Sequence, residues 1–501
     1  MYSLLPLLSL VVPLFIGILH LFVYPFEFME SFFKKIAKIA LLFGTCLTLI
    51  VVVLMVPYIL AGEVLEVPQL SLYADLRNIA GAVGVALIFF LTSIYNVKAE
   101  KGGRLKSSMY NFFLLLFLCC MLGLLLSHDL FGIYLFVELT VGVSVILVAH
   151  NPSKLSTEAA FKYLIITAVS ALFVLLGVLI IFILTGSSNL FAIINDTNIQ
   201  TRLIENPLFL MLAVACFIIG LGADIGLVPF HGWLPDVFPG SSIIINGFFC
   251  AEPIALILAL YKLVYPFYGI YPSNVIIAMM IGVGLVSMVS GALLAYAQKN
   301  FYRMLAYCSI DEFGHAVFAL GLLTSKITTA TSSIPPSMSF VAGQYYLINS
   351  ALMKTGMILS LGSVFFNSGI GNMDSLGGLL GKMKKTALSY IICALSLTGV
   401  PPLSGFYAKW LLYNVAYDFL LPLGGIVVAV SALILLVCIS MISFIFLIRS
   451  FHRIFMGQST QNLEKVNEVH LTMWLPTAVL AATAVLLGLQ PNILLSLIGA
   501  A

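Results

Sequence analysis

Charged residues are scarce in this sequence. Lys, Arg, Asp and Glu make up 9% of the 501 residues, whereas hydrophobic residues make up 61%. A soluble globular protein cannot bury so large an apolar fraction. The apolar runs are continuous over about 20 residues, which predicts transmembrane helices and excludes the shorter, alternating strands of a membrane β-barrel. The fold class is therefore an all-α, multi-pass membrane protein.

Motifs for cofactors are also missing. The eight Cys are dispersed singly or as the pair Cys119-Cys120, without a CxxC or a Cys/His cluster at metal spacing. This argues against iron–sulfur and zinc sites and indicates buried thiols. No nucleotide-binding glycine pattern joins a strand to a helix. We expect no metal, cofactor or redox centre in this chain, and the sequence leaves open whether it is part of an enzyme.

Long apolar windows predict about fourteen spans. They lie near 2–23, 36–61, 76–97, 107–127, 129–149, 157–185, 207–226 (with a short broken piece to about 238), 242–265, 274–297, 303–323, 337–366, 386–417, 419–450 and 471–498. No basic segment precedes the first run, so we interpret it as a span and not as a removed signal. The longest polar connections are near 187–206, 324–336, 367–385 and 451–470.

Positive charges sort the connections into two sets. Those after odd-numbered spans carry Lys34, Lys35, Lys38, Lys98, Lys101, Arg104, Lys106, Lys154, Lys299, Lys382, Lys384, Lys385, Arg453 and Lys465. Those after even-numbered spans carry little beyond Arg77, Arg202 and Lys326. The positive-inside rule then places the odd connections in the cytoplasm and both termini outside the cell membrane.

Two predicted spans are interrupted by proline. The run GLGADIGLVPFHGWLPDVFPG (220–240) breaks the seventh span, and LTGVPPLSGFYAKWLL breaks the twelfth. The two broken spans lie five places apart in the order of spans, an odd number, so the two helices cross in opposite directions. Broken helices at matching places in two opposed halves are typical of inverted-repeat transporters. We expect repeats at spans 4–8 and 9–13, giving segments 1–106, 107–265, 274–450 and 451–501.

Ionisable side chains at membrane depth are the candidate site, because each is costly unless it lines a cavity or has a partner. The candidates for ion translocation are Glu138, Asp224, His231, Lys354 and Lys409. The candidate relay residues are Glu252, Asp311, Glu312, His315 and Lys162. Such groups change one another's proton affinity through the low dielectric, so a file of them can pass protons.

Simpler interpretations remain open for the relay set. Glu252 precedes a proline and can be merely solvated near the membrane–water interface. Asp311 and Glu312 can form a structural ion pair with Arg303. His315 can be a hydrogen-bonded core histidine, and Lys162 can extend its amine to the membrane surface.

Five runs in order resemble one family. They are SHDLFGIYLFVE, GLVPFHGWLPD, AQKNFYRMLAYCSI, YYLINSALMKTG and GVPPLSGFYAKW. They resemble the proton-conducting membrane transporters, which comprise the antiporter-like subunits of complex I, of membrane-bound hydrogenases and sulfur-reducing complexes, and the Mrp antiporter proteins of the A and D types. The resemblance covers about residues 107–415. It implies fourteen core helices, and it matches Glu138, His231, Lys354 and Lys409 to the family's motif residues.

The resemblance has three departures. Asp224 stands where the family has lysine, Ile254 (with Glu252 nearby) stands at the usual lysine of the eighth span, and Asp311-Glu312 replaces a common serine–histidine. Two accounts compete. Either the first half-channel is degenerate or recoupled, or Glu138 and Asp224 share a proton or bind a cation.

The resemblance implies a subunit that moves H⁺, or exchanges it for Na⁺, in an Mrp-type or complex I-like assembly. The expected partners are a quinone- or hydrogenase-module membrane arm, another antiporter-like protein, and lipid, but no nucleic acid. Iron–sulfur and nickel–iron centres are expected in partner subunits. The rival functions are a structural spacer and a stand-alone transporter of an organic solute.

Overall fold

The computed structural model describes residues 4–23, 31–100, 102–323, 337–458, 463 and 466–500. Nearly all of this is helix. The charges at Lys101, Lys326 and Lys465, and the connection 324–336, lie outside the described residues, as do the side chains of Lys34 and Lys35.

The main helices are α1 (Leu5–Val23), α2 (Ser31–Leu60), α3 (Ile79–Ala99), α4 (Ser107–Leu126), α5 (Leu130–Val148), α6 (Lys154–Thr185), α9 (Pro207–Ile225), α12 (Glu252–Ile270), α13 (Asn274–Tyr296), α14 (Phe301–Gly321), α15 (Met338–Ser368), α16 (Lys384–Thr398), α17 (Ser404–Phe451) and α18 (Leu471–Leu489). The short helices are η3 (Pro68–Leu70), α7 (Leu190–Asn195), α8 (Thr197–Glu205), η4 (His231–Trp233), α10 (Leu234–Gly240), α11 (Ile243–Phe249), η5 (Met373–Ser375), η6 (His452–Met456) and α19 (Asn492–Ile498). The strands β1 (Leu65–Val67) and β2 (Leu72–Ala74) pair antiparallel.

Twelve helical stretches of the described chain are long and apolar enough to cross a membrane. α14 and α16 are not among them: α14 carries Arg303, Asp311 and Glu312, and α16 has only 15 residues. They occupy the positions of the predicted tenth and twelfth spans. The predicted connection near 187–206 contains two short helices, α7 and α8.

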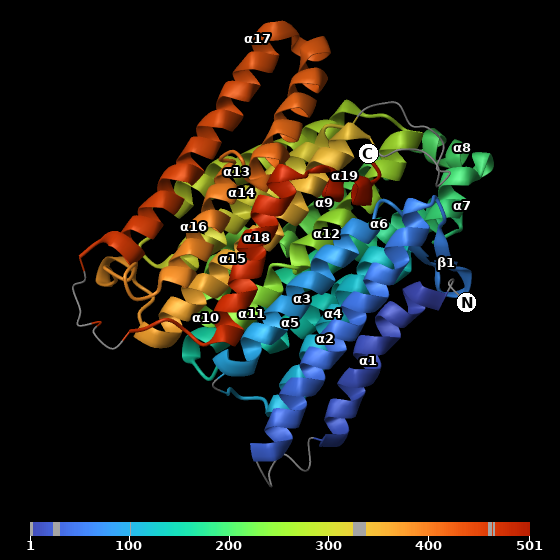
Figure 1. Ribbon diagram of the computed structural model, residues 1–501. Coiled ribbons are helices and arrows are strands. Elements are labelled where there is room, and N and C mark those ends of the chain that lie inside the picture. Colours follow the sequence, from blue (N-terminus) through green and yellow to red (C-terminus); the bar gives the residue numbers. More distant parts are fainter. Residues whose placement is uncertain are drawn as a thin grey trace.

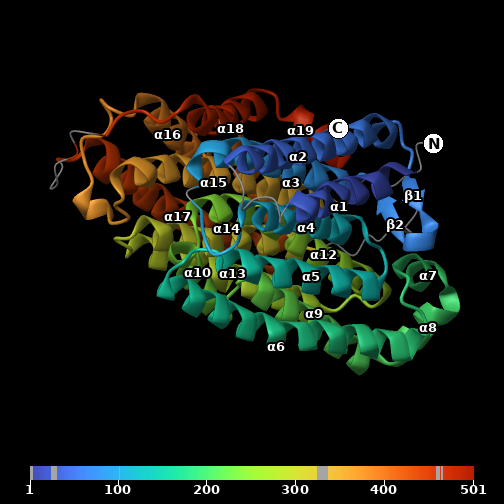
Figure 2. The ribbon, with the colours of Figure 1, turned by 90° about the horizontal axis from the view of Figure 1, so that it is seen from below.

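The long helices lie side by side and connect at two ends (Figure 1). One end holds the turns near Arg104, Lys154, Lys299, Lys382 and Arg453, and we call it the basic face. The opposite end holds the β-hairpin, α7 and α8. Seen from below, α6 lies on one side and α2 and α18 on the other, with α12, α14 and α15 between them (Figure 2).

α15 is the central helix. Every residue from Ser339 to Val364 is buried, and the helix packs against α3, α11, α14, α16, α17 and α18. A helix buried on all sides belongs to the core of a large protein. Lys354 lies in the middle of this helix, so its ammonium group must find partners within the protein.

Both predicted breaks are present and have the same local form. α9 ends at Ile225 before Gly226 (φ 85°), and α16 ends at Thr398 before Gly399 (φ 86°). A positive φ is cheap only for glycine, which explains that residue at both helix ends. Three residues after each of these glycines the chain has a cis-proline, Pro229 at the first break and Pro402 at the second.

α17 is a hairpin of two helices. Its backbone leaves helical geometry at Gly425 (φ 69°, ψ −175°), so the turn falls later than the predicted boundary near 418. The hairpin rises beyond the other helices at the top of Figure 1. Many of its apolar side chains are exposed, including Val427 at 76%, as expected for a surface that faces lipid or a partner.

Candidate functional site

A buried ion pair joins α14 to α15. Lys354 Nζ lies 2.7 Å from Glu312 Oε2, and the two side chains are 3% and 4% exposed. Cys308 Sγ lies 3.5 Å from Glu312 Oε1, and the ring of Phe313 lies 4.9 Å from the ammonium group. The attraction between the opposite charges offsets the cost of removing both groups from water. Two candidates predicted from separate helices are therefore direct partners.

α14 carries a second buried polar pair, His315 and Asp311. His315 Nδ1 lies 3.2 Å from Asp311 Oδ1, and Ser443 of α17 donates a 2.6 Å hydrogen bond to Asp311 Oδ2. The His315 ring stacks on Tyr346 at 5.2 Å. Asp311 and Glu312 do not pair with Arg303, whose guanidinium lies 3.0 Å from Asp236 instead. The alternative of a structural pair with Arg303 is therefore wrong.

Lys409 lies at the second break. Its side chain is buried, and Nζ donates a 3.0 Å hydrogen bond to the carbonyl of Thr398, the last residue of α16. The free carbonyls at a helix C-terminus carry partial negative charge and stabilise an ammonium group there. A cavity of about 290 Å³, lined by Lys409, Trp410, Tyr413 and Met441 among others, adjoins this site. Lys409 is also within electrostatic range of Asp311 and Glu312.

Asp224 lies at the first break, near the end of α9, and is 2% exposed. Its Oδ1 has no hydrogen-bond partner among the described residues. The neighbouring backbone is held by Trp233, whose Nε1 donates a 3.0 Å bond to the carbonyl of Ala223. The indole stacks on Tyr163 of α6 at 4.1 Å. The break is therefore well supported, whereas its carboxylate is not fully satisfied.

Glu252 is buried, so the interpretation that it is merely solvated is wrong. It is 4% exposed and accepts a 3.2 Å hydrogen bond from the hydroxyl of Tyr163, which in turn accepts a 2.9 Å bond from Ser144. Asp224 is within electrostatic range of both Glu252 and Glu138. Glu138 is half-buried and its Oε1 has no partner in the described chain. The first half thus gathers three carboxylates.

A small cavity connects the two halves. It has a volume of about 30 Å³ and is lined by Asp224, Glu252, Cys250, Ser350 and Lys354, together with apolar side chains. That volume is enough for about one or two water molecules. The acids of the first half and the lysine of the second half therefore border the same space.

Two candidates lie apart from this group. His231 is half-buried in η4, and its ring centroid lies 6.5 Å from that of Tyr307; among the described residues, no hydrogen bond or ion pair joins it to another candidate. Lys162 lies 2.8 Å from both Glu158 and Asp236, and its side chain is 45% exposed. Lys162 is thus in a surface ion-pair network, in agreement with the simpler interpretation that its amine reaches the surface.

The described residues contain no group of three or more His, Cys, Asp or Glu side chains that could hold a metal ion. Within that part of the chain, the eight Cys are all free, and six of them are buried. The site is built from carboxylates, lysines and hydroxyl groups, a donor set that passes protons or binds hard monovalent cations through oxygen.

Comparison with known proteins decides the family. The family model described as "NADH:quinone oxidoreductase/Mrp antiporter, TM" matches residues 127–436, more than half of the chain. The chain belongs to this family. It is 29% identical over 342 residues to NADH-quinone oxidoreductase subunit N of Desulforudis audaxviator, a match that covers 67% of this chain and 64% of that protein. It is 27% identical over 424 residues to a Na(+)/H(+) antiporter protein of Alkalihalophilus pseudofirmus. This match covers 82% of this chain and 51% of that protein.

Chains of two solved complexes share the fold. A chain of the Mrp complex from Dietzia sp. aligns with a TM-score of 0.83 at 22% identity, covering 100% of this chain and 96% of that one. A chain of the archaeal membrane-bound sulfane sulfur reductase aligns with a TM-score of 0.82, also at 22% identity, covering 99% and 96%. The curated relatives are longer than the part this chain matches, about two thirds of the quinone oxidoreductase protein and half of the Na(+)/H(+) antiporter protein.

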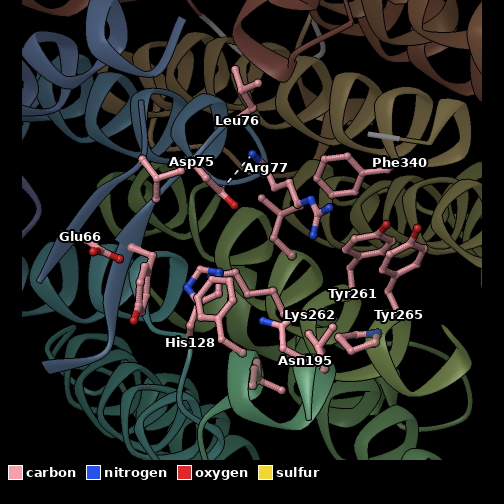
Figure 3. A pocket seen from close by; sticks show the side chains of 17 residues that line it. Glu66, Asp75, Leu76, Arg77, His128, Asn195, Tyr261, Lys262, Tyr265 and Phe340 are labelled. Carbon is pink, nitrogen blue, oxygen red and sulfur yellow. Dashed lines mark hydrogen bonds between the residues drawn. The ribbon is translucent and has the colours of Figure 1, made fainter. Parts of the chain in front are cut away.

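Lys262 is a buried lysine of this antiporter-family chain that the sequence predictions did not include. Its Nζ donates to the carbonyls of Leu125 and, at 3.1 Å, Ser127, at the end of α4. It lines a cavity of about 420 Å³ near the β-hairpin end, with Asp75, Arg77 and His128 (Figure 3). The sequence could have indicated this buried lysine, since the run LALYKLVYP holds one lysine among mostly apolar residues. Burial lowers the pKa of His128 well below its ordinary value, and the neighbouring positive charge of Lys262 lowers it further.

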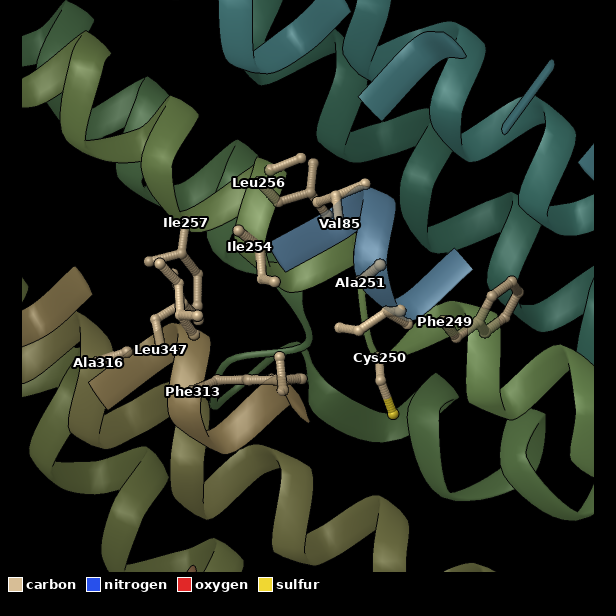
Figure 4. Packing of buried hydrophobic residues seen from close by; sticks show 14 of the residues in the cluster. Val85, Phe249, Cys250, Ala251, Ile254, Leu256, Ile257, Phe313, Ala316 and Leu347 are labelled. Carbon is tan, nitrogen blue, oxygen red and sulfur yellow. The ribbon is translucent and has the colours of Figure 1, made fainter. Parts of the chain in front are cut away.

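A layer of buried apolar side chains lies between this larger cavity and the charged groups. Ile254 and Ile257 of α12 pack with Leu347 of α15 and with Phe313 and Ala316 of α14 (Figure 4). All five are at most 7% exposed. Lys262 follows Glu252 by ten residues on α12, about 15 Å along the helix axis. The cavity at Lys262 is therefore not continuous with the candidate site.

Proposed function

We propose that this chain is an antiporter-like, ion-translocating subunit of a multisubunit energy-converting complex in the cell membrane. It moves H⁺, or exchanges H⁺ for Na⁺, using energy released in other subunits. The observation that carries the proposal is the buried series Glu312–Lys354–Lys409, in which one lysine is paired with a carboxylate and the other binds the open end of a broken helix. Such groups change charge in response to one another.

The second half supplies the switching element of this proposal. When a proton neutralises Glu312, Lys354 loses its partner, and the electrostatic field at Lys409 changes. Lys409 then releases its proton to the adjoining cavity or takes one from it. The hydrogen bond to Thr398 holds the amine in place while its charge changes.

The first half works differently in this proposal because its central group is acidic. Asp224 lies within electrostatic range of both Glu138 and Glu252, and carboxylates so placed cannot all stay ionised cheaply in a low dielectric. They therefore retain a proton or bind a cation such as Na⁺. The competing account, a first half that does not conduct, makes the chain a recoupled or structural paralogue.

The matching breaks support the proposed organisation into an N-terminal segment 1–106, repeats 107–265 and 274–450, and a final segment 451–501. In this arrangement the basic face is cytoplasmic and both termini lie outside. The partners would be other membrane subunits, including a second antiporter-like chain, with iron–sulfur or nickel–iron centres confined to them.

Ion flux in vesicles that contain the complex tests the proposal. We expect Lys409→Ala to reduce coupled H⁺ uptake at least tenfold, while Lys299→Ala, which removes a lysine side chain that is 75% exposed, leaves it unchanged. A structural spacer predicts equal uptake in both variants. A stand-alone transporter of an organic solute predicts transport by the isolated chain.

A further inference from the structure

Buried polar groups without partners gather at a second place, the end of α3 near the basic face. Thr92, Ser93 and Asn96 are each at most 1% exposed. The hydroxyls of Thr92 and Ser93 and both amide atoms of Asn96 have no hydrogen-bond partner among the described residues. On the facing helix α4, Asn111 is fully buried and its Oδ1 is likewise unpaired, although its Nδ2 donates to Ala37.

This arrangement needs a further occupant. An amide or hydroxyl in an apolar interior without a hydrogen bond is costly, so such groups are nearly always paired with protein or ordered water. The other unpaired buried atoms include those of Glu138, Asp224 and His315 on the candidate ion path. The groups on α3 are likewise buried and unpaired, but α3 and α4 contribute no residue to the candidate ion path.

The polar residues form a continuous line along α3. Thr92, Asn96 and Glu100 follow one another at intervals of four residues, which places them on one face about one turn apart. The line reaches the surface at an ion pair: Lys38 Nζ lies 3.2 Å from Glu100 Oε2, with side chains 22% and 8% exposed. α3 ends at Ala99, on the basic face.

The other end of the line points to Lys354. Thr92 packs against α11, where its Cγ2 lies 3.1 Å and its Oγ1 3.6 Å from the position that a Cβ on Gly247 would occupy. One turn later, Cys250 borders the 30 Å³ cavity that Lys354 also lines. The unpaired groups therefore extend from the Lys38–Glu100 pair on the basic face to α11, one turn before Cys250, which borders the cavity.

We propose that the ends of α3 and α4 enclose a chain of water molecules that carries protons from the Lys38–Glu100 pair to the cavity beside Lys354. Asn96 and Asn111 hold the central waters, and Ser93 and Thr92 hold those nearer the cavity. Each water accepts a proton from one neighbour and gives another to the next, so one proton enters and one leaves without any change of oxidation state. This route rests on the proposed function only for the use of Lys354 at its end.

Proton uptake by the assembled complex in vesicles tests the route. Asn96→Leu replaces the amide with an apolar group of similar size, and we expect at least a tenfold loss of uptake from the basic face. Asn96→Ser keeps a polar group and room for water, so we expect most uptake to remain. The control is Asn414→Leu, because Asn414 is exposed on α17 and, within the described part of the chain, bonds only to its own helix at Trp410.

The outcomes separate this route from the proposed function. Normal uptake by Asn96→Leu, with uptake abolished by Lys354→Ala, overturns the route alone. Normal uptake by both variants contradicts the proposed function. Should Asn96→Leu fail to assemble, a density map of the wild-type complex that resolves ordered water decides the question. Water bound to Asn96 and Asn111 supports the route, and a dry site overturns it.

Discussion

Lys354 and Glu312 form an ion pair at 2.7 Å in which neither side chain is more than 4% exposed. Their helices are joined through residues 324–336, yet the two groups meet in the centre of the molecule. The pair is positioned by two helices that are buried along most of their length. Removing either charge leaves the other buried without a full partner, and the first prediction follows from this.

Glu312→Gln is expected to lower the free energy of unfolding by about 3–5 kcal/mol and to abolish transport, because it leaves the Lys354 ammonium without its counter-charge. Thermal unfolding of the purified chain and H⁺ uptake by the complex measure the two effects. The double variant Glu312→Gln/Lys354→Met removes both charges and should recover most of the stability while remaining inactive. Additive losses of stability would show that the two groups do not interact.

Asp224→Asn separates the two accounts of the first half. If Asp224 and its neighbouring carboxylates hold a proton or Na⁺, removing one acid is expected to shift the Na⁺ concentration for half-maximal activity at least tenfold. Flux measured at several Na⁺ concentrations gives that value. Unchanged pumping and unchanged Na⁺ dependence would eliminate the carboxylate site and leave the non-conducting account. Asp196→Asn, at an exposed helix cap on the opposite end from the basic face, is the control.

Gly405→Ala is expected to disrupt the second break. A Cβ at this position would lie 1.6 Å from the carbonyl oxygen of Ser396, so the start of α17 must move away from α16. Such a shift costs about 1–3 kcal/mol or more, and it displaces the Lys409–Thr398 contact. The loss appears as lower thermal stability and lower flux. Gly282→Ala is the matched control, because a Cβ there meets no atom within 4 Å outside the local backbone of its own helix.

The sequence predicted the parts of the site that depend on position along a helix. The apolar windows located the spans, the prolines located the breaks, and isolated charges such as Lys354 and Lys409 identified buried groups. The sequence could not predict partners, which depend on how helices pack. A pair of Arg303 with Asp311 or Glu312 was one open alternative because they share a helix, but Arg303 pairs instead with Asp236 from another helix. Neutral groups such as Asn96 carried no signal, since nothing in the sequence says that their partners are missing.

His150 provides a prediction of pH dependence. It lies in the turn after α5, where its ring stacks on Tyr110 at 4.4 Å and its Nδ1 accepts a 3.3 Å hydrogen bond from the backbone of Leu105. Burial lowers its pKa to about 4, below the ordinary value of about 6.5. The unfolded chain therefore takes up a proton near pH 6.5 that the folded chain refuses until about pH 4. The contribution of His150 to stability is complete above pH 6.5 and is lost as the pH falls toward 4.

Thermal unfolding of the solubilised chain at pH 7.5, 6 and 5 measures this contribution. We expect the wild-type melting temperature to fall more steeply with decreasing pH than that of His150→Gln, because glutamine keeps a hydrogen-bonding side chain but does not titrate. The difference between the two curves isolates His150 from the other groups that titrate in this range. Parallel curves from pH 7.5 to 5 would mean that the folded chain protonates His150 as readily as the unfolded chain does, which contradicts the prediction because a protonated Nδ1 cannot accept the bond from Leu105.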